Sequence, residues 1–117
     1  MIKETAAKLF ILSKEKSADS TLRVLEIISL VQATQLEKVI EEYKKIVKGE
    51  IKVAQIFSAN ELQKDVKSEI EKTLKELHEN LVFLYVEDKS LLGGLMVKID
   101  DDIVNETVIN KIRKFKF

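Results

Sequence analysis

Apolar residues spaced three and four positions apart dominate the first part of the chain and predict helices there. One short run, from Ile2 to Lys16, places most of its apolar residues on one side of a helix. A longer run, from Leu22 to Val47, keeps the same period. The polar residues 17–20 (SADS) separate the two runs and offer N-cap oxygens to the second.

The longer run has two interpretations. Thr34 and Glu37 have the spacing of a capping box, so residues 22–47 form either one long helix or a helical hairpin. Three lysines near its end suit a helix C-terminus, and Gly49 can adopt the left-handed conformation that closes a helix. We therefore expect a short helical region over residues 1–49.

After Gly49 the apolar period becomes that of strands. Residues 51–57 and 81–86 are rich in β-branched and aromatic residues and predict two strands. Between them lies a helix, which we expect to start at a capping box formed by Ser58 and Glu61. Its apolar stripe comprises Leu62, Val66, Ile70, Leu74 and Leu77. A strand, a helix and a strand at this spacing predict a parallel crossover.

A third strand, residues 95–99, follows a glycine pair, and Asn105 has the character of an N-cap for a short last helix. The whole pattern predicts an α+β fold. N-terminal helices precede a small β-α-β-β-α domain with a mixed sheet over residues 50–117.

Composition and charge exclude several classes of function. The sequence has 20 basic and 20 acidic residues, so no net charge attracts nucleic acid or an anionic membrane. It has no cysteine, which excludes disulfides and thiol chemistry. No apolar run approaches the roughly 20 residues that a membrane span needs, so we expect no direct membrane insertion.

The candidate chemical sites are weak. Gly93 and Gly94 are not followed by the lysine and hydroxyl residue of a phosphate loop. Acidic residues 100–102 lack the alternation and central glycine of a calcium loop. His78, the only histidine, is best explained as a surface or helix-capping residue. We therefore expect no catalytic, cofactor-binding or metal-binding residues.

One helical stretch is more apolar than a single packed face requires. Residues 24–31 carry apolar side chains on more than one side. Either they are buried within the helical region, or they form a face for a partner or a second copy. The candidate face comprises Val24, Ile27, Leu30 and Val31.

Several motifs in the second half together resemble the C-terminal domain of the ATP synthase delta subunit, or oligomycin-sensitivity-conferring protein, family. The resemblance rests on a Ser-Ala pair, a D-x-S-L-hydrophobic-G-G segment before a strand, and a polar segment before the last helix. The matching residues are Ser58, Ala59, Leu62, Asp88, Ser90, Leu91, Gly93, Gly94, Asn105 and Thr107. The family usually has Asp and Ser at the last two of these positions, and its N-terminal region is a six-helix bundle.

The resemblance implies a non-catalytic stator subunit of a rotary, proton-translocating ATP synthase. Such a subunit links subunit b of the peripheral stalk to the alpha subunits of the catalytic head. It would lie on the cytoplasmic side of the cell membrane and be peripheral through the complex. The alternative is a free-standing homo-oligomeric interaction module with the same C-terminal fold.

Overall fold

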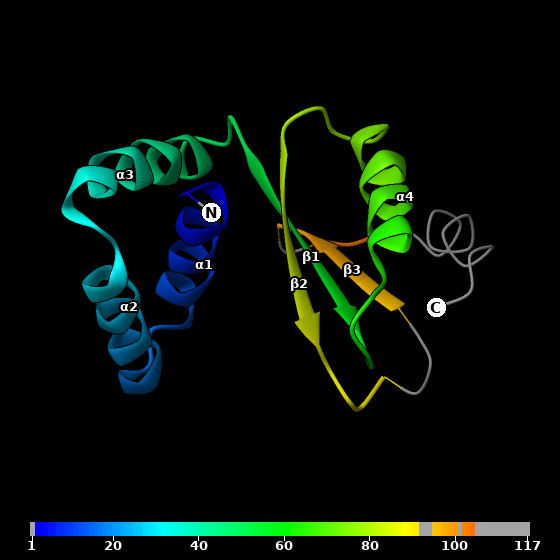
Figure 1. Ribbon diagram of the computed structural model, residues 1–117, viewed down its shortest axis with the longest axis horizontal. Helices are drawn as coiled ribbons and strands as arrows, with labels where there is room; N and C mark the ends of the chain where they lie inside the picture. The colour runs from blue at the N-terminus through cyan, green and yellow to red at the C-terminus, as the bar shows by residue number, and fades with distance from the viewer. Residues whose placement is uncertain (1, 92–94, 101, 105–117) are drawn as a thin grey trace. The chain divides into compact units, whose positions relative to one another are not determined.

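A computed structural model describes residues 2–91, 95–100 and 102–104. The chain divides into two compact units, Met1–Ile51 and Lys52–Phe117, called here the helical unit and the sheet unit. Helices α1 to α3 belong to the first, and β1, α4, β2, β3 and β4 to the second (Figure 1). This order confirms the predicted α+β class, with N-terminal helices followed by a sheet.

The helical unit is organised around its first helix. α1 (Ile2–Glu15) packs against both α2 (Ala18–Leu30) and α3 (Ala33–Val47). Ala6 and Ala7 of α1 are completely buried, and side chains this small allow helices to approach closely. The rings of Phe10 and Tyr43 meet edge to face at 6.2 Å and join α1 to α3. α1 is therefore the central element of this unit.

The start of α2 is fixed by a reciprocal serine cap. The Ser20 N–H donates to the Ser17 hydroxyl, and the Ser17 N–H donates to the Ser20 hydroxyl, both at 3.0 Å. Each bond satisfies an amide that a helix start otherwise leaves unpaired. The polar break predicted at residues 17–20 is confirmed.

The long apolar run is broken into two helices, which decides between the two interpretations. Val31 has an extended backbone, and Gln32 is the N-cap of α3 without a side-chain bond. The predicted capping box was wrong, because Thr34 lies inside α3 rather than at its start. The carbonyl of Ile28 instead accepts the Val31 N–H and closes α2.

The end of α3 has the geometry expected of a glycine cap. Gly49 has a φ of 81°, in the left-handed region. Its N–H donates to the Ile46 carbonyl, and the Glu50 N–H donates to the Lys45 carbonyl, both at 3.0 Å. These two bonds form a Schellman motif, so the predicted helix end near Lys48 is confirmed.

The sheet unit holds a mixed sheet with strand order β2-β1-β3-β4. β1 (Lys52–Ser58) pairs in parallel with β2 (Leu81–Glu87) and antiparallel with β3 (Leu95–Ile99). β4 (Asp102–Ile103) adds a short antiparallel pair beside β3. α4 (Lys64–Lys75) connects the two parallel strands, as the crossover prediction required. The predicted helix from Asn105 lies outside the described residues.

The core of this unit lies between α4 and one face of the sheet. Val66, Ile70 and Leu74 recur along one side of α4 and are buried. Alternate residues of the strands pack against them, because successive strand side chains point to opposite faces. The buried strand residues in this cluster are Ala54, Ile56, Leu95, Val97 and Ile99.

The predicted start of α4 was wrong. Ser58 is the last residue of β1, and its hydroxyl donates to the Asn60 carbonyl at 2.7 Å. α4 begins at Lys64, with Gln63 as N-cap. The Ser58 hydroxyl bonds to Asn60 and the helix starts only at Lys64, so the capping-box pattern misplaced this boundary.

We predict that Ile70→Ala lowers the free energy of unfolding by about 2–5 kcal/mol, because Ile70 is fully buried and a cavity would remain. Urea denaturation followed by circular dichroism measures the change. Ile40→Ala is the matched control, since Ile40 is 46% exposed on α3 and should cost less than about 1 kcal/mol. Equal losses in both variants would contradict the assigned core.

Candidate functional site

Among the residues that carry the family resemblance, Ser58, Ala59 and Asp88 lie at one end of the sheet. Ser58 and Ala59 lie where β1 ends, and Asp88 lies directly after β2. Because these strands are parallel, their carboxyl ends lie at the same edge. The Asp88 N–H donates to the Ser58 carbonyl at 2.7 Å and joins the two segments. Leu62 is buried in the adjoining core.

The segment after β2 forms a tight turn around Asp88. The backbone N–H and the hydroxyl of Ser90 donate to Asp88 Oδ1 at 3.0 and 2.6 Å. The Leu91 N–H donates to the Asp88 carbonyl at 3.1 Å. Asp88 and Ser90 therefore shape the turn that leads toward Gly93 and Gly94. Those glycines, with Asn105 and Thr107, lie outside the described residues.

We predict that the Asp88 carboxyl titrates below the ordinary pKa of aspartate, because the Ser90 hydroxyl and then the Ser90 amide favour its ionised form. A folded-state pKa that is lowered stabilises the turn at pH values above the unfolded-state pKa. That contribution is lost as pH falls through the folded pKa.

The 13C chemical shift of the Asp88 side-chain carboxyl, recorded by NMR as a function of pH, measures this pKa. Ser90→Ala should move the pKa of Asp88 upward, toward the ordinary value. Ser68→Ala, on the exposed side of α4, is the control and should leave it in place. An unchanged Asp88 pKa in Ser90→Ala would contradict the assignment.

A pocket of about 200 Å³ opens beside this turn. Its lining comprises Ser58, Glu61, Leu62, Lys67, Tyr85, Val86 and Glu87. The Tyr85 hydroxyl donates to Glu71 Oε2 at 2.8 Å, and Lys67 Nζ lies 4.7 Å from the centre of the Tyr85 ring. Burial, followed by the Glu71 bond, raises the pKa of Tyr85 well above its ordinary value. Tyr85 therefore stays neutral and ties β2 to α4.

The sequence predicts no catalytic or metal-binding role for His78 or for the acidic residues 100–102. His78 follows α4, its N–H donates to the Leu74 carbonyl, and it lines neither described pocket. Among residues 2–91, 95–100 and 102–104, no three His, Asp or Glu side chains gather in a way that could hold a metal ion. In the same ranges, no helix is long and apolar enough to cross a membrane.

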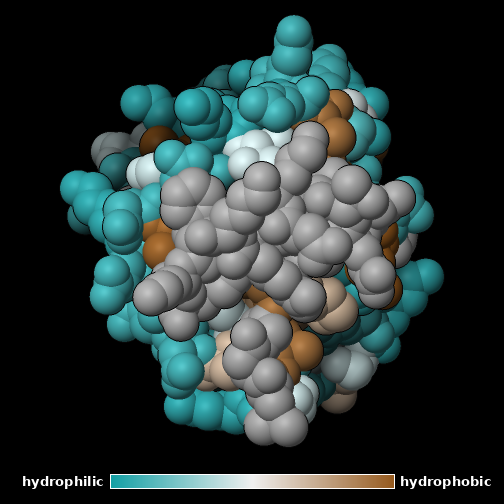
Figure 2. Space-filling view, turned by 90° about the vertical axis from the view of Figure 1, so that its right-hand side faces the viewer, coloured by the Kyte–Doolittle hydropathy of each residue, from teal (hydrophilic) through white to brown (hydrophobic). Residues whose placement is uncertain are grey.

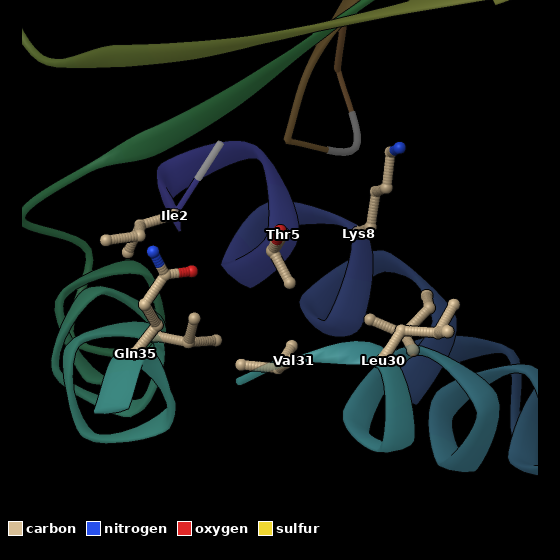
Figure 3. A pocket seen from close by; sticks show the side chains of 8 residues that line it. Ile2, Thr5, Lys8, Leu30, Val31 and Gln35 are labelled. Carbon is tan, nitrogen blue, oxygen red and sulfur yellow. The ribbon is translucent and has the colours of Figure 1, made fainter. Parts of the chain in front are cut away.

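The residues of the candidate partner face at α2 differ in their exposure. Val24 is half-buried, whereas Leu30 is 83% exposed. Ile27, Leu30 and Val31 line a pocket of about 270 Å³ where α2 ends and α3 begins. Residues of α1 form its opposite wall, and Figure 3 shows Ile2 and Thr5 there, with Lys8 extending away.

A different set of α2 residues forms an exposed apolar stripe. Leu22, Leu25 and Ile28 are 60%, 57% and 40% exposed, and their spacing of three places them along one side of the helix. The sequence left open whether residues 24–31 are buried, and Leu25 and Ile28 of that stretch are exposed. Periodicity shows which residues share a face, but the contact between α2 and α1 decides which face is buried. We call this set the α2 stripe.

The surface shown in Figure 2 has a different character. Outside the grey area it is mostly hydrophilic, with hydrophobic residues visible at a few points. The α2 stripe exposes three large apolar side chains in a chain that is 34% charged.

Comparison with known proteins identifies the family of this chain. The family model of the ATP synthase delta (OSCP) subunit matches residues 2–117. The chain belongs to this family. The family resemblance drawn from the sequence is thus confirmed, and the match includes both units.

Curated relatives are all delta subunits of ATP synthases. The chain is 31% identical over 94 residues to ATP synthase subunit delta of Clostridium beijerinckii. It is 34% identical over 84 residues to that of Clostridium botulinum (strain Eklund 17B / Type B), and 39% over 62 residues to that of Tolumonas auensis. The alignments cover 80%, 70% and 52% of this chain.

This delta-family chain spans about half the length of the relatives, or less. The matched segments cover 49%, 44% and 35% of the three proteins. Binding partners of the complete relatives are therefore assigned to this chain only as a proposal.

Proposed function

We propose that this chain is a non-catalytic stator subunit of a rotary ATP synthase, which links subunit b of the peripheral stalk to the alpha subunits of the head. The observation that carries the proposal is the family match across residues 2–117, since it includes both compact units. A linker needs two binding regions. The two units supply them.

The helical unit is the better candidate for the contact with the alpha subunits. Its α2 stripe exposes Leu22, Leu25 and Ile28 to water, which costs free energy unless a partner covers them. A stable interface buries on the order of 800 Å² per partner, so neighbouring apolar residues would join the stripe. Leu30 and Val31, which line the pocket at the end of α2, suit that role.

The sheet unit is then the region that meets subunit b. Its α4 side chains and Asp88 turn are held by specific bonds, including Tyr85 to Glu71 and Ser90 to Asp88. Such bonds resist deformation of the surface that transmits force. In this proposal the chain contributes stiffness and affinity rather than bond chemistry. It is held at the cytoplasmic side of the membrane by the complex.

We predict that the chain copurifies with subunit b and alpha subunits, and that Leu25→Lys weakens the alpha contact at least about tenfold. A lysine in the α2 stripe would have to lose its hydration on binding. Pull-down and calorimetry with purified alpha and b subunits measure both contacts. Binding to b should persist in this variant, because Leu25 belongs to the helical unit.

Leu77→Lys is the matched control, since Leu77 is 47% exposed and lies in the sheet unit. It should leave the alpha contact intact. Binding to neither subunit would contradict the stator proposal. A stable dimer that Leu25→Lys dissociates, without any binding to b or alpha, would favour the homo-oligomeric module.

We also predict a shallow salt dependence for binding to subunit b. The chain has zero formal net charge, so apolar burial rather than long-range attraction should supply most of the affinity. Titration calorimetry at low and physiological salt should give dissociation constants within about threefold of each other. A loss of tenfold or more would contradict apolar burial as the main source of affinity.

A further inference from the structure

The outer edge of β2 is the feature that carries a further inference. β2 is the first strand in the order β2-β1-β3-β4, and among the described strands it pairs with β1 alone (Figure 1). The opposite end of the sheet is formed by the two-residue β4, which begins with Asp102. Short, charged edge strands discourage pairing with other chains. β2 has seven residues, and its only charged residue is Glu87, at its end.

The hydrogen bonds at the two ends of β2 show which of its residues face outward. The Lys52 N–H donates to the Asn80 carbonyl, and the Asp88 N–H donates to the Ser58 carbonyl. In a parallel ladder every second residue of a strand bonds to its neighbour. Even-numbered residues of β2 therefore bond to β1. The N–H and C=O groups of Leu81, Phe83, Tyr85 and Glu87 point away from β1.

Apart from Glu87 at its end, the side chains of this strand contain none of the usual barriers to pairing. Residues 81–86 (LVFLYV) include no charge, proline or glycine, and consist of residues that favour strands. Natural edge strands commonly carry lysine, proline or a bulge that blocks a second chain. We propose that the outer edge of β2 pairs antiparallel with β2 of a second copy of this chain.

The strand is complementary to itself in one register. With the twofold axis at Leu84, Phe83 lies opposite Tyr85 of the second copy, and outward backbone groups meet outward backbone groups. Val82 then lies opposite Val86, on the other face. Phe83 and Tyr85 both pack on the α4 side of the sheet, so the pair places two aromatic rings together.

Charge favours this antiparallel arrangement over a parallel one. The antiparallel register directs Lys89 toward Glu79 of the second copy, beyond the strand ends. A parallel pair in register would place Glu87 beside Glu87. Because Lys89 and Glu79 are both exposed and of opposite charge, the antiparallel pair avoids repulsion.

Analytical ultracentrifugation of the full chain over a range of concentrations tests the proposal. We expect a monomer–dimer equilibrium, which Val86→Lys weakens about tenfold, because the change puts a lysine in place of one valine in both symmetry-related Val82–Val86 pairs. Val47→Lys is the matched control and should leave the equilibrium unchanged. Val86 is 37% exposed and Val47 is 59% exposed, so both positions tolerate the change.

Amide hydrogen exchange identifies the interface directly. The amides of Val82, Leu84 and Val86 should be protected at every concentration, which also reports that Val86→Lys is folded. The amides of Leu81, Phe83 and Tyr85 should gain protection only as dimer forms.

Three outcomes would overturn the proposal. The first is a monomer at all concentrations, and the second is outward amides whose protection does not depend on concentration. The third is a dimer that resists Val86→Lys and dissociates with Leu25→Lys, which would place the interface on α2. Self-association goes beyond the stator function. Copurification with subunit b and alpha subunits can fail or succeed independently of all three results.

Discussion

The packing of α4 against β1 and β3 is the interaction on which the rest of the sheet unit depends. Ile70 and Leu74 of α4 and Ile56 and Val97 of the strands are almost inaccessible to water. Burial of this kind contributes roughly 25 cal/mol per Å² and is the main force that holds a parallel crossover closed. It also brings the ends of β1 and β2 together, where the Asp88 turn connects to Ser58. The position of the family residues thus follows from the core.

The helical unit shows a different balance. Its buried apolar side chains are Ala6, Ala7, Leu9, Val39 and Ile46. Two of these are alanines, so the core of the helical unit contains few large side chains, whereas the leucines of α2 remain exposed. A small domain that leaves large apolar side chains in water gives up stability that a partner can restore. We interpret this balance as the physical basis of the proposed docking to the catalytic head.

Much of the fold was predictable from local rules. The helical period, the cap at Ser17, the glycine at position 49 and the β-branched runs placed the elements correctly, because each depends on neighbouring residues. The ends of helices and strands that depend on tertiary contacts were harder to predict from the sequence. Ser58 resembles an N-cap in sequence, yet its hydroxyl bonds to Asn60 and its backbone pairs within the sheet. Likewise, Leu25 and Ile28 have the spacing of a buried stripe, but α1 covers the neighbouring side of α2.

The candidate site was predictable only through family resemblance. Ser58 and Asp88 are far apart in the sequence, and no rule of composition or spacing shows that one backbone bond joins them. Their motif order identified the family, which the match over residues 2–117 confirmed. The proposed function then rests on a mechanical argument: a linker that transmits force would act through two interfaces and through its rigidity.

Coupling in membranes that contain the complete synthase tests this account most directly. ATP hydrolysis and ATP-driven proton transport would be measured with and without the chain. We expect hydrolysis to continue without it, and proton transport to fail until the chain is added back. Proton transport that is unaffected by removal of the chain would contradict the stator function.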